Sequence, residues 1–182
     1  MRSTRPIVHA LLCLSALLVA RPAQGQWSIA PSVALGTAVP AGAFSRDVAE
    51  SVTLKGALWL RAPRVPVGLT IEGMYAQFRD ARPNVASEDT HLGAVIANVT
   101  TRRHERKLEL YGVAGAGWYW RNGPTDSFAD HQAPGINVGV GEIIALGSRD
   151  FFVELRLHAV RTPARTGEQW LTFMPLMIGA RF

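Results

Sequence analysis

Residues 27–36 (WSIAPSVALG) alternate between two kinds of side chain, and this alternation decides the fold. The larger apolar side chains share one face of an extended chain: Trp27, Ile29, Pro31, Val33 and Leu35. The small ones share the other face: Ser28, Ala30, Ser32, Ala34 and Gly36. Because the side chains of a β-strand point alternately to opposite faces, a period of two predicts a strand with one apolar face and one small-residue face.

Strand-like stretches of this kind recur along the chain, separated by clusters of polar residues, glycine and proline. We predict eight strands, at residues 27–36, 51–61, 67–79, 90–101, 108–120, 135–146, 151–160 and 170–182. No sustained helical repeat lies between them, so neighbouring strands are expected to pair antiparallel in a meander. Because proline removes a ladder hydrogen bond, Pro31 and Pro175 predict a weakened seam between the first and last strands.

The charged residues of these strands share a face with small residues, and the large aliphatic residues occupy the opposite face. In residues 51–61, Lys55 and Arg61 lie opposite Val52 and Leu54. In residues 151–160, the polar face carries Glu154, Arg156 and His158, opposite Phe151, Val153, Leu155 and Leu157. A soluble barrel would turn the aliphatic face inward and leave an outer surface of Gly, Ala and Ser. We therefore predict that the aliphatic face contacts lipid, and that small and charged residues fill the narrow interior of an eight-stranded barrel.

Two strands do not fix their own orientation. Both faces of residues 108–120 (LELYGVAGAGWYW) offer apolar or glycine positions, and residues 90–101 are equally ambiguous. In residues 170–182, the apolar face is spoiled because Phe173 and Met177 lie opposite it. That apolar face comprises Trp170, Met174, Leu176, Ile178 and Phe182.

The connections between the predicted strands alternate in length. Residues 37–50, 80–89, 121–134 and 161–169 are long, whereas residues 62–66, 102–107 and 147–150 are short. Outer-membrane barrels have short periplasmic turns and longer extracellular loops. The pattern predicts an all-β, eight-stranded antiparallel up-and-down transmembrane β-barrel with four long extracellular loops. Aromatic residues near strand ends are expected in interfacial girdles: Trp27, Tyr75, Tyr119, Trp120 and Trp170.

The segment before the first strand has the features of a secretory signal peptide. Arg2 and Arg5 precede an apolar run at residues 7–20, and residues 23–25 (AQG) form a small-x-small site. The run is shorter than the about 20 residues of a membrane-spanning helix. We expect residues 1–25 to be removed by cleavage after Gly25, with cleavage after Ala20 as the alternative. Residues 26–182 then form the mature barrel domain.

Removing this segment changes what charge and cysteine content imply. The nineteen Lys and Arg lose Arg2, Arg5 and Arg21, against fourteen Asp and Glu, so the net charge falls from +5 to +2. This ordinary charge, without a basic stripe, gives no indication of nucleic-acid binding. The single cysteine, Cys13, lies in the removed run, so the mature domain has no disulfide, thiol nucleophile or thiolate metal site.

The end of the chain resembles a known family. Residues 170–182 (WLTFMPLMIGARF) form an alternating strand ending in Phe182 and resemble the C-terminal signature by which outer-membrane barrels are recognised by their assembly machinery. Residues 33–44 (VALGTAVPAGAF), 135–141 (GINVGVG) and 152–158 (FVELRLH) are similar to segments of small OmpA/OmpX-like barrel domains. The resemblance covers residues 26–182. It implies location in the bacterial outer membrane, contact with its lipids, and binding of the assembly machinery through the last strand.

Glu154, Arg156 and His158 share one face and are the candidate site residues. Because an unpaired buried charge costs several kcal/mol, we expect them to form an internal ion-pair network with partners among Lys55, Arg61, Glu72 and Arg181. The mature histidines fall on different elements without ligand spacing, so no metal site is expected: His91, His104, His131 and His158. We expect no catalytic residue and no cofactor.

These features predict a non-enzymatic outer-membrane barrel, not an open pore, with a structural or surface-interaction role through its long loops. The loops carry charges of both signs and identify no extracellular ligand. One alternative is a lipid-modifying enzyme of the lipid A deacylase type. That family has a His-x-Ser late in the barrel, whereas this chain has His158-Ala159-Val160 and lacks the nucleophile. A palmitoyl transferase would need an apolar interior pocket, and the charged residues predicted for the lumen argue against one. A third possibility is a soluble periplasmic β-barrel that carries a small apolar ligand.

Overall fold

The computed structural model describes residues 27–46, 48–63, 65–81, 89–105, 108–122, 131–147, 149–164 and 167–182. The predicted signal peptide lies outside them. One short 3-10 helix, η1 (Gly42–Arg46), accompanies eight strands: β1 (Ser28–Ala41), β2 (Val48–Arg61), β3 (Val67–Asp80), β4 (Thr90–Glu105), β5 (Leu108–Asn122), β6 (His131–Leu146), β7 (Arg149–Ala164) and β8 (Gly167–Arg181). Within the described residues, no helix is both long and apolar enough to cross a bilayer.

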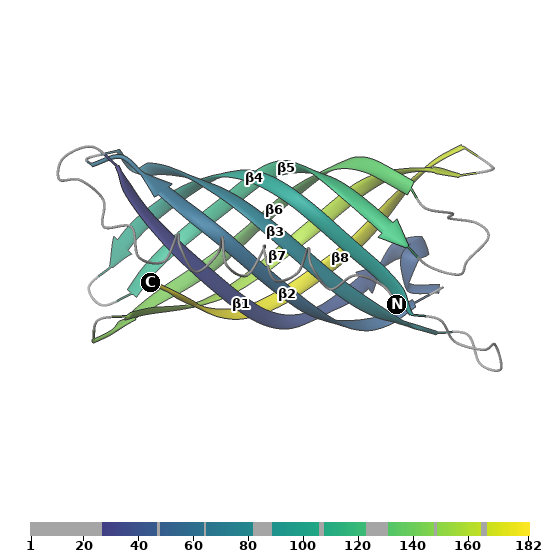
Figure 1. Ribbon diagram of the computed structural model, residues 1–182, viewed down its shortest axis with the longest axis horizontal. Coiled ribbons are helices and arrows are strands. Elements are labelled where there is room, and N and C mark those ends of the chain that lie inside the picture. The colour runs from purple at the N-terminus through teal and green to yellow at the C-terminus, as the bar shows by residue number, and fades with distance from the viewer. Residues whose placement is uncertain are drawn as a thin grey trace, which may run out of the picture.

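The strands form a closed barrel in chain order, with each pair of neighbours antiparallel (Figure 1). β8 closes the sheet against β1, in a ladder that runs from Ser32↔Arg181 to Ala41↔Thr172. The predicted eight-stranded up-and-down barrel is thus confirmed. We call the end that holds the β2–β3, β4–β5 and β6–β7 connections the turn end. The opposite end, which holds the other four connections, is the loop end.

The strands are longer than the sequence pattern predicted, mainly at the loop end. β1 continues to Ala41 and β2 starts at Val48, within the predicted connection 37–50. The predicted long connection 161–169 is wrong, because β7 runs to Ala164 and β8 starts at Gly167. Pairing there continues from Arg161↔Trp170 to Ala164↔Gly167. Polar residues mark where a strand leaves the apolar layer, whereas the backbone ladder continues until the hairpin closes.

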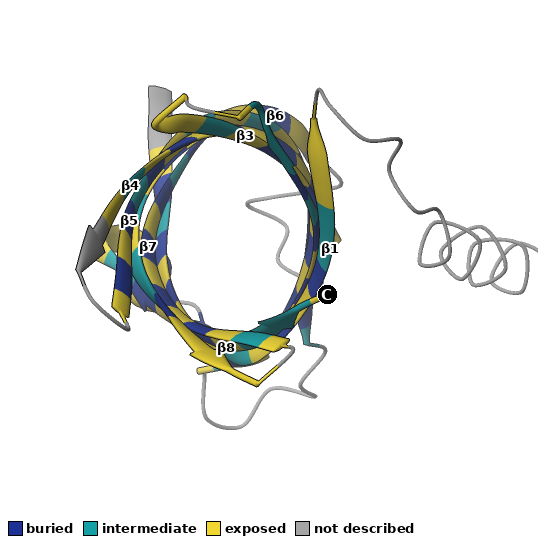
Figure 2. Ribbon diagram, turned by 90° about the vertical axis from the view of Figure 1, so that its left-hand side faces the viewer, coloured by how far each residue is buried: buried dark blue, intermediate teal, exposed yellow. Residues whose placement is uncertain are grey.

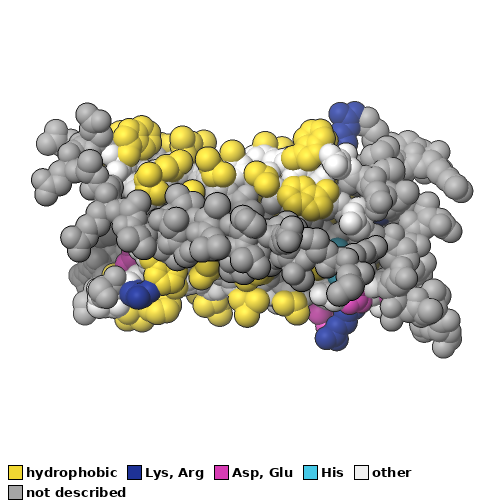
Figure 3. All heavy atoms as spheres, viewed as in Figure 1, with side chains coloured by type: hydrophobic (Ala, Val, Ile, Leu, Met, Phe, Trp, Pro, Cys, Tyr) yellow, Lys and Arg dark blue, Asp and Glu magenta, His cyan; other side chains and the backbone are white. Residues whose placement is uncertain are grey.

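Burial alternates along the strands as predicted, with the large aliphatic side chains outside and the small and charged ones inside (Figure 2). Lys55 and Glu154 are buried, at 4% and 1% exposure, whereas Val52 and Leu155 are 62% and 47% exposed. Where side chains are coloured in Figure 3, apolar ones predominate between the two ends of the barrel. This orientation contradicts the soluble-carrier alternative, which needs the apolar face inside.

The structure also orients the strands that the sequence left open. In β4, Leu92, Ile96 and Asn98 face the interior and Val95 and Val99 face outward. In β5, the interior residues are Tyr111, Val113 and Tyr119, and the outward ones include Leu110, Trp118 and Trp120. In β8, Phe173 and Met177 are interior side chains, and the predicted apolar face is exposed.

The aromatic residues expected in the girdles are exposed with one exception. Trp27, Tyr75, Trp120 and Trp170 are between 41% and 54% exposed, but Tyr119 is 1% exposed and lies in the lumen. The prediction for Tyr119 was wrong because β5 carries aromatic residues on both faces. Trp118, on the same face as Trp120, is 50% exposed.

Pro175 interrupts a ladder, though not where the sequence suggested. Pairing between β1 and β8 passes Ala38↔Pro175 without a break. Between β7 and β8, pairing stops after Leu155↔Leu176 and resumes at His158↔Phe173. The interruption is therefore on the β7 side of β8, whereas the weak seam was predicted between β1 and β8.

Candidate functional site

A network of charged side chains crosses the middle of the lumen and contains the candidate residues. Lys55, on β2, donates a hydrogen bond to Glu154, on β7, and lies 3.9 Å from Glu72, on β3. Arg156 donates to both carboxylate oxygens of Glu72, at 3.0 Å from Nη2 to Oε2, and to Glu154 at 2.9 Å. All four side chains are at most 4% exposed. Two cations face two anions, so the network is neutral.

Neutral polar groups complete the network on its other sides. The Tyr111 hydroxyl donates to Glu154 Oε2 at 2.8 Å. Asn137 accepts from Arg156 at 3.3 Å and donates to Asn98 at 2.8 Å, and Asn98 in turn donates to the Thr70 hydroxyl at 3.0 Å. The side chains come from six strands, β2 to β7, so the network braces the barrel across its diameter.

Glycines on the inner face of β6 provide the space that these large side chains need. A Cβ at Gly139 would lie 2.5 Å from Arg156 Cγ, and a Cβ at Gly141 would lie 2.3 Å from Tyr111 Cζ. Real Cβ atoms do not approach so closely. The sequence expectation that small residues leave room for internal charges is therefore met by particular pairs across neighbouring strands.

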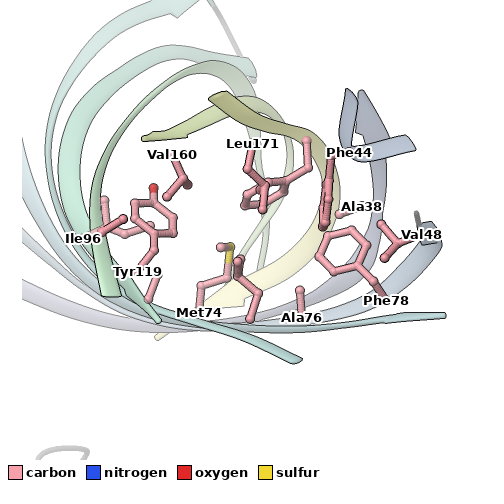
Figure 4. Close-up of a cluster of buried hydrophobic side chains, with 14 residues drawn as sticks. Ala38, Phe44, Val48, Met74, Ala76, Phe78, Ile96, Tyr119, Val160 and Leu171 are labelled. Carbon is pink, nitrogen blue, oxygen red and sulfur yellow. The ribbon is translucent and has the colours of Figure 1, made fainter. Parts of the chain in front are cut away.

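Toward the loop end, aromatic rings stack above the charged network. The Tyr119 hydroxyl is hydrogen-bonded to His158 Nδ1 at 2.9 Å, and His158 stacks on Phe173 with ring centroids 4.8 Å apart. Phe173 contacts Phe78 at 5.8 Å, and Phe78 contacts Phe44 at 5.0 Å. Phe44 belongs to η1. These rings lie in a buried apolar cluster inside the barrel (Figure 4).

The first connection folds back over the loop-end mouth to place Phe44 there. Gly42 begins η1 with φ 63°, a left-handed conformation that favours glycine because other residues are strained there. The Thr172 hydroxyl holds the turn by donating to the Ala41 carbonyl at 2.9 Å. Phe44 is consequently 3% exposed although its element lies outside the sheet.

Toward the turn end, a second apolar cluster lies below the charged network and centres on Trp59. Its ring contacts Tyr111 at 5.4 Å and Phe152 at 6.2 Å, both edge-on, and its Nε1 donates to the Ser32 hydroxyl at 2.9 Å. Described side chains thus occupy the lumen in three layers: apolar, charged, apolar.

Outside, the exposed aliphatic side chains form a belt, and one charged residue lies within it. Glu142 faces outward on β6, opposite Leu110 on β5 and Val153 on β7. Its neighbours along the strand are the exposed Val140 and Ile144. Within the described part of the chain, Glu142 has no ion-pair partner. A carboxylate in this position is costly in hydrocarbon.

Comparison of the sequence with protein-family models and with curated proteins finds no match. Solved structures do match. Neisserial surface protein A (NspA) superposes with a TM-score of 0.61 at 15% identity, covering 88% of this chain and 98% of that one. A major outer membrane protein from Thermus thermophilus gives a TM-score of 0.56 at 13% identity, covering 85% and 99%. The chain has the fold of the small outer-membrane β-barrels. Its fold and apolar belt are those of a protein of the bacterial outer membrane.

In this outer-membrane barrel, the predicted network is present with some of its predicted partners. Glu154 and Arg156 meet Lys55 and Glu72 as expected. Arg181 instead pairs with Asp150, 2.5 Å from Nη2 to Oδ2, at the turn end. Arg61 is also at that end. His158 lies beside the network, with Tyr119 as its partner.

The sequence did not indicate the uncharged members of the network. Asn98 and Asn137 could have been suggested by their position on the small-residue face of a strand, but β4 had no assigned orientation. Among the described residues, no group of three or more His, Cys, Asp or Glu side chains is arranged to hold a metal ion. His91 stacks with Tyr75 at the loop end, and the side chains of His104 and His131 lie outside the described ones.

Proposed function

We propose that this protein is a closed, non-enzymatic barrel with a structural or surface-interaction role, and that its loop end faces the outside of the cell. The observation that carries the proposal is the filled lumen. Its central charges neutralise one another, and apolar clusters lie on both sides of them. A partner from outside would then contact the loop end of the barrel and not its interior.

The rim at the loop end has the chemistry of a mixed polar and aromatic surface. His91 Nδ1 is hydrogen-bonded to the Tyr75 hydroxyl at 2.6 Å, and Gln77 donates to Asp89 at 2.6 Å. Trp118 donates to Gln132 at 3.2 Å. Except for Asp89, these groups sit on paired strands, so they are held in place before any partner binds. Their mixture favours a macromolecular contact without selecting one ligand.

A planar-bilayer recording tests the closed lumen. We expect no steady conductance from the purified protein, with a porin as the positive control, because buried side chains such as Arg156 and Phe173 occupy the lumen. Reproducible open-channel steps that scale with protein concentration would overturn the closed-barrel proposal.

The orientation is testable because the chain has one cysteine, Cys13, in the predicted signal peptide. Glu50→Cys places a thiol on the exposed loop end, and Arg149→Cys places a matched one on the turn end. A membrane-impermeant maleimide should label Glu50→Cys in intact cells and Arg149→Cys only after lysis. The reverse pattern would show that the turn end faces outside.

The lipid A deacylase alternative is disfavoured by the position of His158. That histidine is 1% exposed and points into the lumen, whereas acyl-chain substrates approach from the lipid face. The following outward position, Ala159, offers no nucleophile. Incubation of the purified protein with lipid A should release no fatty acid, and release that is lost in His158→Gln would favour the enzyme.

We also propose that residues 1–25 are a signal peptide and that β8 is the strand bound by the barrel assembly machinery. The exposed side chains of β8, such as Leu176 and Ile178, together with Phe182 support the second point. N-terminal sequencing of the mature protein should begin at Gln26; a start at Arg21 would establish the alternative cleavage. Phe182→Ala should slow membrane insertion, and an unchanged insertion rate would count against a role for Phe182.

A further inference from the structure

The turn-end mouth of the barrel is lined by three arginines that point inward. Arg61 on β2, Arg102 on β4 and Arg181 on β8 each lie an even number of residues from a buried interior side chain of the same strand. The guanidinium groups of Arg102 and Arg181 lie 5.3 Å and 5.6 Å from the Trp59 ring centroid. Trp59, in the turn-end apolar cluster of the lumen, forms the floor of this mouth.

Two of the three arginines have a carboxylate partner. Arg102 Nη1 lies 2.5 Å from Glu109 Oε1. Arg181 donates to Asp150 Oδ2 from Nε at 3.1 Å and from Nη2 at 2.5 Å. The first pair is largely buried and the second is partly exposed, and in each the carboxylate binds its own arginine.

Arg61 differs from the other two. Among the described residues, no carboxylate lies within ion-pair distance of its guanidinium, although its charge and that of Arg181 both repel Arg102. Among the described side chains at the mouth, these three arginines therefore face two carboxylates, Glu109 and Asp150. Arg61 also lines a cavity of about 450 Å³, together with Ser28, Ala62, Pro63, Val65 and Pro66.

We propose that this cavity is a binding site for a phosphate-type oxyanion held by the Arg61 guanidinium. The exposed Ser28 hydroxyl, which donates to the Arg61 carbonyl at 3.4 Å, turns to donate to the bound anion. A guanidinium offers parallel N–H donors that match two oxygens of a phosphate. Because Arg102 and Arg181 each face a carboxylate, Arg61 supplies the unbalanced positive charge among the described mouth residues, and the bound anion offsets it. The other walls of this open cavity, Val65 and the two prolines, are apolar and exposed, so Arg61 is the charged group that the anion meets.

The site can be tested on the purified mature protein in a non-ionic maltoside detergent, which contains no phosphate. Titration with inorganic phosphate at constant ionic strength is followed by the amide NMR signals of Ser28, Arg61 and Val65. We expect saturable shifts confined to the turn end. Shifts that stay linear in phosphate, or that spread over both ends of the barrel, would overturn the proposal without any variant.

Variants of Arg61 and Arg149 distinguish phosphate binding in the cavity from general attraction of phosphate to a positively charged barrel end. Arg61→Gln should weaken phosphate affinity at least tenfold, and Arg61→Lys should retain part of it. Arg149→Gln is the matched control, because Arg149 is at the same end but faces outward over Phe182 at 4.7 Å. It removes the same charge and should change affinity less than twofold. Equal weakening by Arg61→Gln and Arg149→Gln would overturn the proposal, and heat-modifiable gel migration verifies that each variant is folded.

The phosphate could be free or belong to a lipid headgroup, and the membrane environment distinguishes the two. The titration is repeated in nanodiscs of phosphatidylcholine with and without phosphatidylglycerol. A lower apparent affinity with phosphatidylglycerol shows that its headgroup competes for the cavity. An unchanged affinity assigns the site to water-borne phosphate.

Discussion

Replacing Arg156 is the most informative perturbation of this barrel, because one side chain joins most of the charged network. Arg156→Met removes the bidentate bond to Glu72 and the bonds to Glu154 and Asn137. Lys55 is then left with two carboxylates, all three buried to at least 96%. Breaking a buried ion pair from one side costs about 3–5 kcal/mol because a charge remains without its partner. At about 1.4 kcal/mol per factor of ten, the folding equilibrium constant should fall roughly a thousandfold.

A charge-balanced double variant separates pairing from packing. In Arg156→Met combined with Glu72→Gln, Lys55 and Glu154 remain as a neutral pair. The cost of the double variant should be below the sum of the two single costs by about 2–3 kcal/mol, the upper range for contacting residues.

Reversible urea unfolding in lipid vesicles, followed by tryptophan fluorescence and heat-modifiable gel migration, measures these free energies. Arg149→Met is the control, because Arg149 faces outward. This variant should unfold at nearly the wild-type urea midpoint. A cost for Arg156→Met below about 1 kcal/mol, the range of solvent-exposed ion pairs, would refute the reasoning. It would mean that water enters the middle of the lumen and solvates the remaining carboxylates.

Three further predictions use other parts of the fold. Gly139→Ala should destabilise the barrel by about 1–3 kcal/mol through overpacking against Arg156. The added Cβ of Gly73→Ala would meet nothing within 4 Å, so the free energy of unfolding of this variant should stay within about 0.5 kcal/mol of wild type in the same urea titration. Equal destabilisation by Gly139→Ala and Gly73→Ala would contradict the packing argument. Glu142→Leu should raise the free energy of unfolding in vesicles by up to about 1 kcal/mol. A lower free energy of unfolding in this variant would indicate that Glu142 has a stabilising partner. Backbone amides beside the gap between Leu155↔Leu176 and His158↔Phe173 should exchange with solvent faster than those of the β1–β8 ladder, and uniform protection around β8 would disprove the interruption.

The sequence could predict which residues share the lumen, because a period of two fixes the face of every residue once one is assigned. Glu154 and Arg156 were therefore expected to meet Lys55 and Glu72. The sequence could not show which of Lys55 and Arg61 contacts Glu154, because the two residues share a face of β2. Their heights in the barrel differ by six residues, and only the register between strands puts Lys55 level with Glu154 and Arg61 at the mouth.

The orientation of β4 and β5 was unpredictable for a different reason. Ile96 is an aliphatic residue on the inner face and is 0% exposed, whereas the small Gly93 and Ala97 share the outer face. This arrangement is the reverse of that in β1, β2, β3 and β7, where large aliphatic side chains face outward and small ones face inward. The orientation of β4 is set by the neighbouring strand β3, because paired residues of a sheet share a face. Glu72 pairs with Ile96, so the interior position of Glu72 turns Ile96 inward.

The error at the connection 161–169 has a consequence for function. Strands of 14 to 16 residues, at about 3.4 Å per residue and a tilt near 40°, reach roughly 36–42 Å along the barrel axis, beyond an apolar band of about 25 Å. At the turn end, outward apolar residues such as Leu108 and Leu146 continue to the last strand positions. At the loop end, the outward positions beyond the belt are polar, as at Gln77 and His91. The surplus length therefore projects from the loop end, and the described part of the rim that a partner would meet is built on paired strands.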